Sequence, residues 1–86
     1  MKQSTIDSIM RHVEHGVDPG GFVTAVLEND LSQAFARADD DNRRDMFEIV
    51  TFVYNKIPSP SWGSPEKVKA WRKRIEDARV PEASAP

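Results

Sequence analysis

The chain has 86 residues, no cysteine and a net charge of −2. Its length allows one domain with a small core, and the lack of cysteine excludes disulfide bridges and thiolate zinc sites. No stretch approaches the roughly 20 apolar residues of a membrane span, and the first residues lack the apolar core of a signal peptide, so we expect a cytoplasmic protein.

The first predicted helix begins with Ser4 as its N-cap and ends before Gly16. Asp7 stands three residues after Ser4 as an approximate capping box, and glycine readily takes the left-handed conformation that ends a helix. Between these signals, apolar residues recur at helical spacing at Ile6, Ile9, Met10 and Val13.

The next segment begins with Asp18 and Pro19, which predict an N-cap and the first turn of a second helix. Apolar residues then keep one stripe over residues 22–38. Asn29 and Asp30 interrupt the polarity of this stripe but not its phase. The pattern therefore leaves open whether the segment is one long helix or two short ones.

The segment from Met46 to Ile57 has apolar residues around most of its circumference. Its β-branched and aromatic residues would suit a strand, but its length and its acidic start favour a helix. We expect this helix at the centre of the domain. Its core residues are predicted to be Phe47, Val50 and Val53, with Phe52 as an exposed exception.

A proline-rich loop separates the central helix from a final one. Pro58 and Pro60 lack an amide hydrogen and must end the central helix. Ser64 as N-cap and Pro65 at the first helical position predict that the final helix begins there. Its narrow apolar stripe consists of Val68, Trp71, Ile75 and Ala78. We expect Trp71 to anchor this helix to the core.

Trp62 stands in the rigid loop directly before the final helix. Two interpretations stay open: its ring caps the apolar end of the domain, or it presents a flat surface to a ligand or partner. In the second case the free backbone amides after Ser64 would receive an anionic group, and Lys67 would neutralise it.

The same region suggests a wider binding site for a phosphate-bearing or nucleotide ligand. Aromatic rings could stack on a base, basic side chains could supply charge, and the helix start at Gly20 and Gly21 offers further free amides. Neither a G-x-G-x-x-G fingerprint nor a P-loop is present. The candidate ligand- or partner-binding residues are Trp62, Ser64, Lys67, Arg43, Arg44, Tyr54 and Arg72.

Two clusters contain residue types that bind metals in other proteins. His12 and His15 could share an ion with Asp18, but no further histidine or cysteine is present to close the site. The aspartates at 39–41, with Asp45, lack the spacing of a calcium loop and are typical of a helix N-terminus. We therefore expect no metal.

Charge is distributed unevenly along the chain. Residues 1–66 carry six Lys/Arg against eleven Asp/Glu, a net of −5, whereas residues 67–79 carry six against two, a net of +4. The basic charges lie on one short helix and no helix-turn-helix signature is present, so we expect no nucleic-acid binding. The opposite signs would attract a second copy of the chain.

The stretches "GGFVTAVLENDLSQAFARAD" and "NRRDMFEIVTFVYNKIPSPSWGSPEKVKAW" resemble a group of short proteins encoded by bacteriophages and prophages. The resemblance covers residues 16–71, and the phrase around Trp62 is its most distinctive part. It implies a phage-type source and no particular activity. Small phage proteins often inhibit or redirect host machinery, so the resemblance implies an accessory role of that kind.

These patterns together predict an all-α fold. We expect a compact bundle of four to five short helices in residues 1–79, which form a single domain, followed by a disordered tail at residues 80–86. The apolar surface of the central helix exceeds what four short neighbours can cover. We therefore expect a homodimer or a higher homo-oligomer.

No catalytic signature such as G-x-S-x-G is present and no cofactor is expected, so the sequence favours binding over catalysis. The first hypothesis is an accessory protein that inhibits or redirects a host protein. The alternative is an oligomeric sponge that sequesters a signalling nucleotide of host defence.

Overall fold

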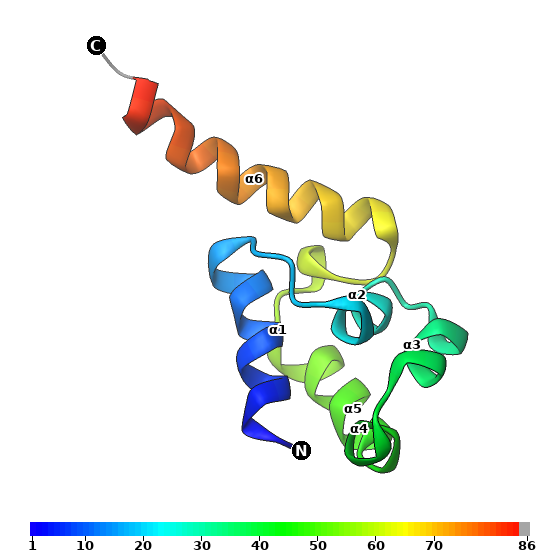
Figure 1. The fold of residues 1–86 in the computed structure, drawn as a ribbon. Helices are drawn as coiled ribbons and strands as arrows, with labels where there is room; N and C mark the ends of the chain where they lie inside the picture. The colour runs from blue at the N-terminus through cyan, green and yellow to red at the C-terminus, as the bar shows by residue number, and fades with distance from the viewer. Residues whose placement is uncertain (85–86) are drawn as a thin grey trace.

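The computed structural model describes the backbone of residues 1–84 and the side chains of residues 1–78. Within that range the chain forms α-helices and one 3-10 turn, and no strand (Figure 1). In chain order the elements are α1 (Gln3–His15), α2 (Gly21–Leu27), α3 (Leu31–Arg37), α4 (Asp40–Arg44), α5 (Met46–Lys56), η1 (Ser59–Ser61) and α6 (Pro65–Ser84). The all-α prediction is confirmed.

The described residues contain six α-helices instead of the four or five expected. The stripe over residues 22–38 is divided into α2 and α3, and the aspartate cluster, where no separate helix was expected, forms the short helix α4. Asn29 takes the left-handed conformation with φ 62° and turns the chain between α2 and α3. Asparagine tolerates this conformation better than most residues other than glycine. The Asp30 side chain then caps α3 by accepting the amide of Gln33 at 3.2 Å. The question left open by the sequence is thus decided in favour of two helices.

The two ends of α1 differ in how well the sequence predicted them. Gly16 ends the helix as expected, with φ 65° and its amide bonded to the carbonyl of His12. The predicted N-cap at Ser4 is wrong, since α1 begins at Gln3 with Lys2 as N-cap. A tertiary contact replaces side-chain capping here: Lys2 Nζ lies 2.7 Å from the carboxylate of Asp39.

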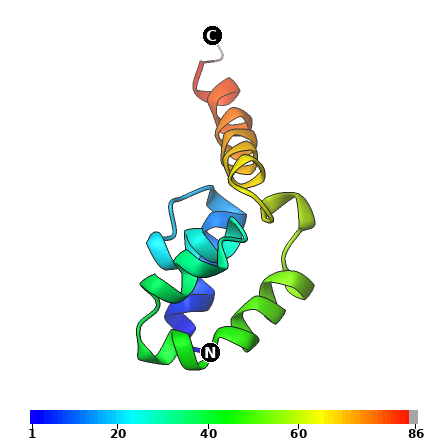
Figure 2. The same cartoon turned by 90° about the vertical axis from the view of Figure 1, so that its right-hand side faces the viewer.

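The core lies between α1, α2, α5 and the first turns of α6. Its buried apolar members are Ile9, Val23, Ala25, Val26, Leu27, Ala34, Ala38, Met46, Ile49, Val53, Ile57 and Val68. α5 contributes only one side to this core and stands at the edge of the domain, where it diverges from α2 and α3 (Figure 2).

Two phenylalanines of α5 exchange the places predicted for them. Phe47 was expected in the core and is 86% exposed, whereas Phe52 was expected outside and packs against the core. Val50, also predicted in the core, is partly exposed at 38%. When a helix is apolar around most of its circumference, the spacing of its apolar residues does not predict which side will be buried.

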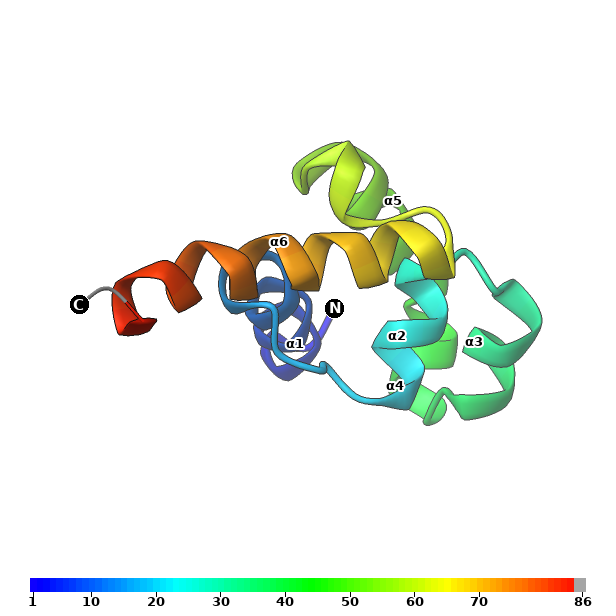
Figure 3. The ribbon, with the colours of Figure 1, turned by 90° about the horizontal axis from the view of Figure 1, so that it is seen from above.

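α6 lies across α1 and α2 when the molecule is seen from above (Figure 3). The crossing at α1 is close, because a Cβ on Gly16 would lie 3.3 Å from the Cβ of Ile75. The far part of α6 projects beyond the body, and the molecule measures 50 × 24 × 21 Å. Its radius of gyration is 13.6 Å, against about 12 Å for a spherical chain of this length.

The segment 80–86, predicted as a tail, contains the last residues of α6 up to Ser84 and two residues outside the described range. None of the helices in the described part of the chain combines the length and the apolar character needed to cross a bilayer.

Candidate functional site

Trp62 follows η1, and backbone hydrogen bonds hold the loop on both sides of it. The amide and the hydroxyl of Ser61 both donate to the Pro58 carbonyl, at 2.9 and 2.6 Å. The Gly63 amide donates to the carbonyl of Leu27 at 2.7 Å and so ties the loop to the end of α2. Gly63 has φ 122°, a conformation that favours glycine. The loop position therefore depends on a contact between segments far apart in sequence.

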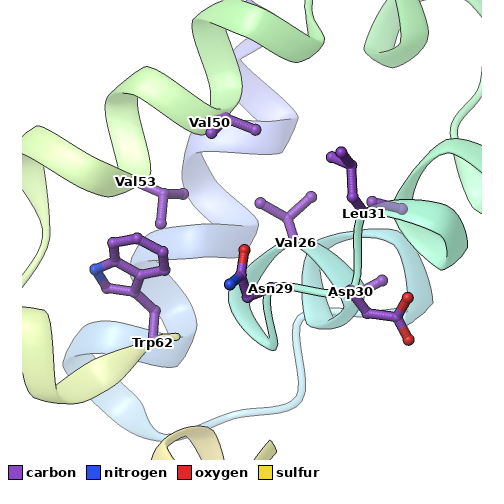
Figure 4. A pocket seen from close by; sticks show the side chains of 9 residues that line it. Val26, Asn29, Asp30, Leu31, Val50, Val53 and Trp62 are labelled. Carbon is purple, nitrogen blue, oxygen red and sulfur yellow. The ribbon is translucent and has the colours of Figure 1, made fainter. Parts of the chain in front are cut away.

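The Trp62 ring is half-buried and packs against the core while one side of it borders a hollow. Figure 4 shows this hollow between the α2–α3 corner and α5, with Val50 and Val53 on one side and Val26 and Leu31 on the other. The hollow is partly open to solvent, and its volume of about 40 Å³ is enough for a few waters or one small apolar group. Trp62 thus packs against the core, as the capping interpretation expects, and also borders a hollow, as the binding interpretation expects.

Tyr54 lies beside Trp62, so two of the predicted site residues are brought together. Their ring centroids are 6.0 Å apart and the rings meet edge to face at 65°. Such a pair contributes about 0.5–1.5 kcal/mol beyond its buried area. The indole Nε1 of Trp62 is buried and finds no hydrogen-bond partner among the described residues.

Large apolar side chains are exposed on α3 and α5, and two of them line the same hollow. Leu31 and Val50 both line it, and Tyr54 touches Trp62 at its end. Phe35 follows Leu31 by one turn of α3, and Phe47 precedes Val50 by one turn of α5, so each extends the surface along its helix. We call the surface made by Leu31, Phe35, Phe47, Val50 and Tyr54 the α3–α5 face. Their exposures are 57, 42, 86, 38 and 72%.

The sequence located only part of this face. It selected Tyr54 as a candidate but placed Phe47 and Val50 in the core and treated Leu31 and Phe35 only as part of the apolar stripe over residues 22–38. The missed signal is the excess of apolar residues on α5, which a single small core cannot cover. That excess led to the expectation of self-association without showing which side stays outside.

The predicted anion site at the start of α6 is largely occupied by the chain itself. The Ser64 hydroxyl accepts the Lys67 amide at 3.1 Å, which confirms Ser64 as the N-cap. Pro65 has no amide hydrogen, and Glu66 places a carboxylate in the first turn. The Lys67 side chain lies over Gly63, with Nζ 3.5 Å from where a Cβ would stand. Few free donors for an anion remain.

The other predicted anion site, at Gly20 and Gly21, also differs from the expectation. α2 begins at Gly21, so Asp18 is not its N-cap as predicted. The Asp18 carboxylate instead accepts the Gly20 amide at 2.9 Å. A carboxylate thus already stands beside this amide, and α2 has only seven residues.

Arg43 and Arg44 lie on α4, at the opposite end of α5 from η1 and Trp62 (Figure 1). α5 has 11 residues, which corresponds to about 16 Å. Arg43 pairs with Asp40 at 3.3 Å, and Arg44 pairs with Asp41. These two predicted site residues are therefore not brought to Trp62.

Arg72 belongs to a buried polar network in which His12 is the central member. His12 is fully buried, and its Nε2 lies 2.8 Å from the Ser61 carbonyl. Arg72 Nε donates to His12 Nδ1 at 3.4 Å, which requires the proton of a neutral ring to be on Nε2. Burial lowers the pKa of His12, the Ser61 bond opposes this, and the Arg72 charge lowers it further. The network joins α1, η1 and α6.

The role of His12 could have been found from its spacing. Thr5, Ile9 and His12 stand four and three residues apart, and all three are buried. Periodicity thus places His12 on the inner side of α1. The short spacing to His15 instead suggests a metal-binding pair. Among the described residues, no group of three or more His, Cys, Asp or Glu side chains is placed so that it could hold a metal ion.

A more open groove of about 540 Å³ runs between Glu28 and α6. Arg72 and the basic residues Lys69 and Lys73 line it, but so do Glu28 and Glu76. Charges of both signs therefore line the groove. This arrangement suits a solvated helix surface better than a site for one kind of ion.

Comparisons with models of known protein families, with curated proteins and with solved structures find no match for this chain. A function must therefore be inferred from the side chains of this protein alone.

Proposed function

We propose that this protein acts by binding another protein through the α3–α5 face and performs no catalysis. The observation that supports this is the exposure of five large apolar side chains on α3 and α5, two of which, Leu31 and Val50, line one hollow. Such side chains on a single surface are typical of protein interfaces, because a monomer gains nothing from exposing them to water. Aromatic residues such as Phe47 and Tyr54 are also the kind that dominates binding energy at interfaces.

We place the target among the proteins of a bacterial host, in its cytoplasm, where binding inhibits or redirects that protein. Two features of the sequence support this part of the proposal. Residues 16–71 resemble short phage and prophage proteins, and the chain has no cysteine, as suits a reducing compartment.

A nucleotide sponge receives less support from the arrangement of the residues selected for it. Arg43 and Arg44 are paired with aspartates at the far end of α5. The Lys67 amide is bonded to Ser64, and Arg72 is engaged with His12. A protein partner is therefore the proposed ligand of the α3–α5 face.

The experiment is capture of host proteins from a bacterial lysate by the tagged chain and by two variants. Phe47→Glu puts a charge on the α3–α5 face at its most exposed side chain, which is 86% exposed. Val17→Glu is the matched control, since Val17 is an exposed apolar residue in the loop after α1. The wild-type chain and Val17→Glu should retain the same specific protein, and Phe47→Glu should lose it.

Trp62 is a poor choice for this test because it also packs against the core. Circular dichroism of both variants checks that the helices are intact. Retention of the same protein by Phe47→Glu, or of no specific protein by any chain, would contradict the proposal.

A further inference from the structure

We propose that the α3–α5 face binds an amphipathic α-helix of its partner, with one aliphatic side chain of that helix in the hollow and a lysine or arginine beside Asp30. The inference rests on the proposed function in one respect, namely that this face binds a protein. It goes further by stating the secondary structure, the apolar spacing and the charge of the bound segment.

The α3–α5 face offers side chains, and few free backbone groups, to a bound segment. The backbone groups of α3 and α5 are bonded within their own helices, except at the helix ends. At the corner that borders the hollow, the Asn29 amide donates to the Val26 carbonyl at 3.0 Å. The Asp30 amide donates to the Ala25 carbonyl at 2.9 Å. Residues 1–84 contain no strand, so they present no sheet edge to an extended segment. A segment that buries its backbone against this face must therefore satisfy that backbone internally, as an α-helix does.

The outer side of α5 beside the hollow has the spacing that fits such a helix. Phe47, Val50 and Tyr54 follow one another by three and four residues, and they are 86, 38 and 72% exposed. At about 100° per residue they lie within a sector of about 60°. Val53, which lines the hollow with Val50, stands about 60° further toward the core. A helix that lies along this stripe thus has one side facing the hollow. It matches the stripe with apolar residues at i, i+3 or i+4, and i+7.

The hollow fits one aliphatic side chain of the bound helix. Figure 4 shows Val50 and Leu31 on opposite sides of the hollow, with the Trp62 ring at one end. The volume of about 40 Å³ admits a small apolar group such as the end of a leucine. Side chains that fill a pocket within an interface contribute a large share of the binding energy. We therefore expect one leucine-sized residue of the partner to be the anchor of the complex.

Charge favours a basic partner. Of the described side chains that line the hollow, only Asp30 carries a charge. One oxygen of this exposed carboxylate caps α3 by accepting the Gln33 amide at 3.2 Å. The α3–α5 face also belongs to residues 1–66, which carry a net charge of −5. Long-range attraction therefore acts in the same direction as the local charge. A lysine or arginine about one turn from the anchor can then pair with Asp30.

The first test is isothermal titration calorimetry of the chain with a designed peptide. The probe is an acetylated and amidated peptide of about 16 residues, with leucines at i, i+3, i+4 and i+7 and with lysines and alanines elsewhere. We expect a one-to-one complex with a micromolar dissociation constant and a gain of helical circular dichroism on mixing. A peptide of the same composition with leucines at alternate positions should bind at least ~10-fold more weakly. Equal binding of the two peptides, or binding of neither, would overturn the inference.

A pair of uncharged variants tests whether the peptide lies at the hollow. Leu31→Gln replaces an apolar wall of the hollow by an amide, at a side chain that is 57% exposed. It should weaken binding of the helical peptide at least ~5-fold, because the anchor then meets a polar group. Val17→Gln makes the same kind of change in the loop after α1 and should bind like the wild type. Unchanged binding by Leu31→Gln would place the peptide elsewhere and overturn the inference.

The second test concerns the charge beside the hollow. Asp30→Asn removes the charge and keeps the helix cap, because asparagine caps a helix about as well as aspartate. It should weaken the lysine peptide by about 2- to 5-fold and leave a peptide with glutamine in place of lysine unaffected. Glu14→Gln removes an exposed charge from α1 and is the matched control, with a smaller effect expected. Equal effects of the two variants would overturn the pairing with Asp30.

A second copy of the chain is the rival occupant, since the sequence predicted that self-association covers the excess apolar surface of α5. Sedimentation velocity of the chain alone, at the concentrations used for calorimetry, separates the two. On our proposal Leu31→Gln sediments like the wild type. A dimer of the wild-type chain that Leu31→Gln dissociates would show that a second copy occupies the face, and it would overturn the inference.

The two proposals fail separately. A chain that captures a host protein through Phe47 but binds no helical peptide refutes the inference and leaves the proposed function standing. A peptide complex that depends on Leu31, together with a lysate that yields no specific protein, does the reverse.

Discussion

Two regions of this molecule differ in how far their side chains are buried and bonded. Where α6 meets α1, polar atoms join the elements: Trp71 Nε1 donates to the Val13 carbonyl at 3.0 Å, and His12 links Ser61 to Arg72. On the α3–α5 face, apolar side chains remain exposed, and two of them line a hollow. Stability and the proposed binding therefore depend on separate residues, even though α5 itself contributes to both the core and the face. Substitutions can therefore disturb one and spare the other.

The largest expected effect comes from the buried side of α5. Ile49 is fully buried in the core, so Ile49→Ala should lower the free energy of unfolding by about 3 kcal/mol through lost burial and a residual cavity. Phe47→Ala, two residues away on the exposed side, should change it by less than ~0.5 kcal/mol. Urea unfolding followed by circular dichroism measures both. Equal losses of unfolding free energy for the two variants would contradict the placement of Phe47 on the exposed side of α5.

The next effect concerns the polar network and depends on pH. Burial lowers the pKa of His12 from its ordinary 6.5, so below that pH the unfolded chain binds a proton that the folded chain does not. The free energy of unfolding should therefore fall as the pH drops below about 6.5, by at most ~1.4 kcal/mol per pH unit. The lowered pKa of Asp39, which Lys2 causes, acts in a more acidic range.

Urea unfolding between about pH 7.5 and 5 measures this dependence. His12→Gln is the control, because glutamine does not titrate and should remove this part of the slope. The prediction is wrong if the wild type and the variant lose stability in parallel.

The smallest effect compares the two tryptophans. Trp71→Phe removes a hydrogen bond to Val13, whereas Trp62→Phe removes an N–H that has no partner among the described residues. Trp71→Phe should therefore cost about 1 kcal/mol more than Trp62→Phe. For a domain of this size that difference corresponds to roughly 4–8 °C in melting temperature. Identical melting temperatures would show that the two indoles are held alike.

Local signals in the sequence predicted the all-α class and several helix ends. Gly16 and the Ser64–Pro65 pair act within one turn of chain, so their effects are the same in most tertiary settings. The start of α1 was predicted less well because Lys2 is held by Asp39, 37 residues away. The corner at Asn29 was undecided because the apolar stripe keeps its phase across it.

The candidate site was predicted only in part, for a related reason. The contact of Tyr54 with Trp62 depends on the hydrogen bond from the Gly63 amide to the Leu27 carbonyl. No local sequence pattern predicts a hydrogen bond between segments so far apart. Arg43 and Arg44, in contrast, stand three residues after aspartates, and this spacing could have indicated that their charges are engaged. Long-range packing decided which apolar residues of α5 stay outside.

The positions of the two tryptophans allow binding at the α3–α5 face to be measured by the fluorescence of the chain itself. Trp62 is half-buried at the wall of the hollow, whereas Trp71 does not line it and is hydrogen-bonded to α1, with Arg74 stacked over its ring at 5.3 Å. Indole emission moves to shorter wavelength when water is removed from the ring. A protein that settles on the α3–α5 face would thus change the light emitted by Trp62 and leave that of Trp71 as an internal reference, so association can be followed on the unlabelled chain.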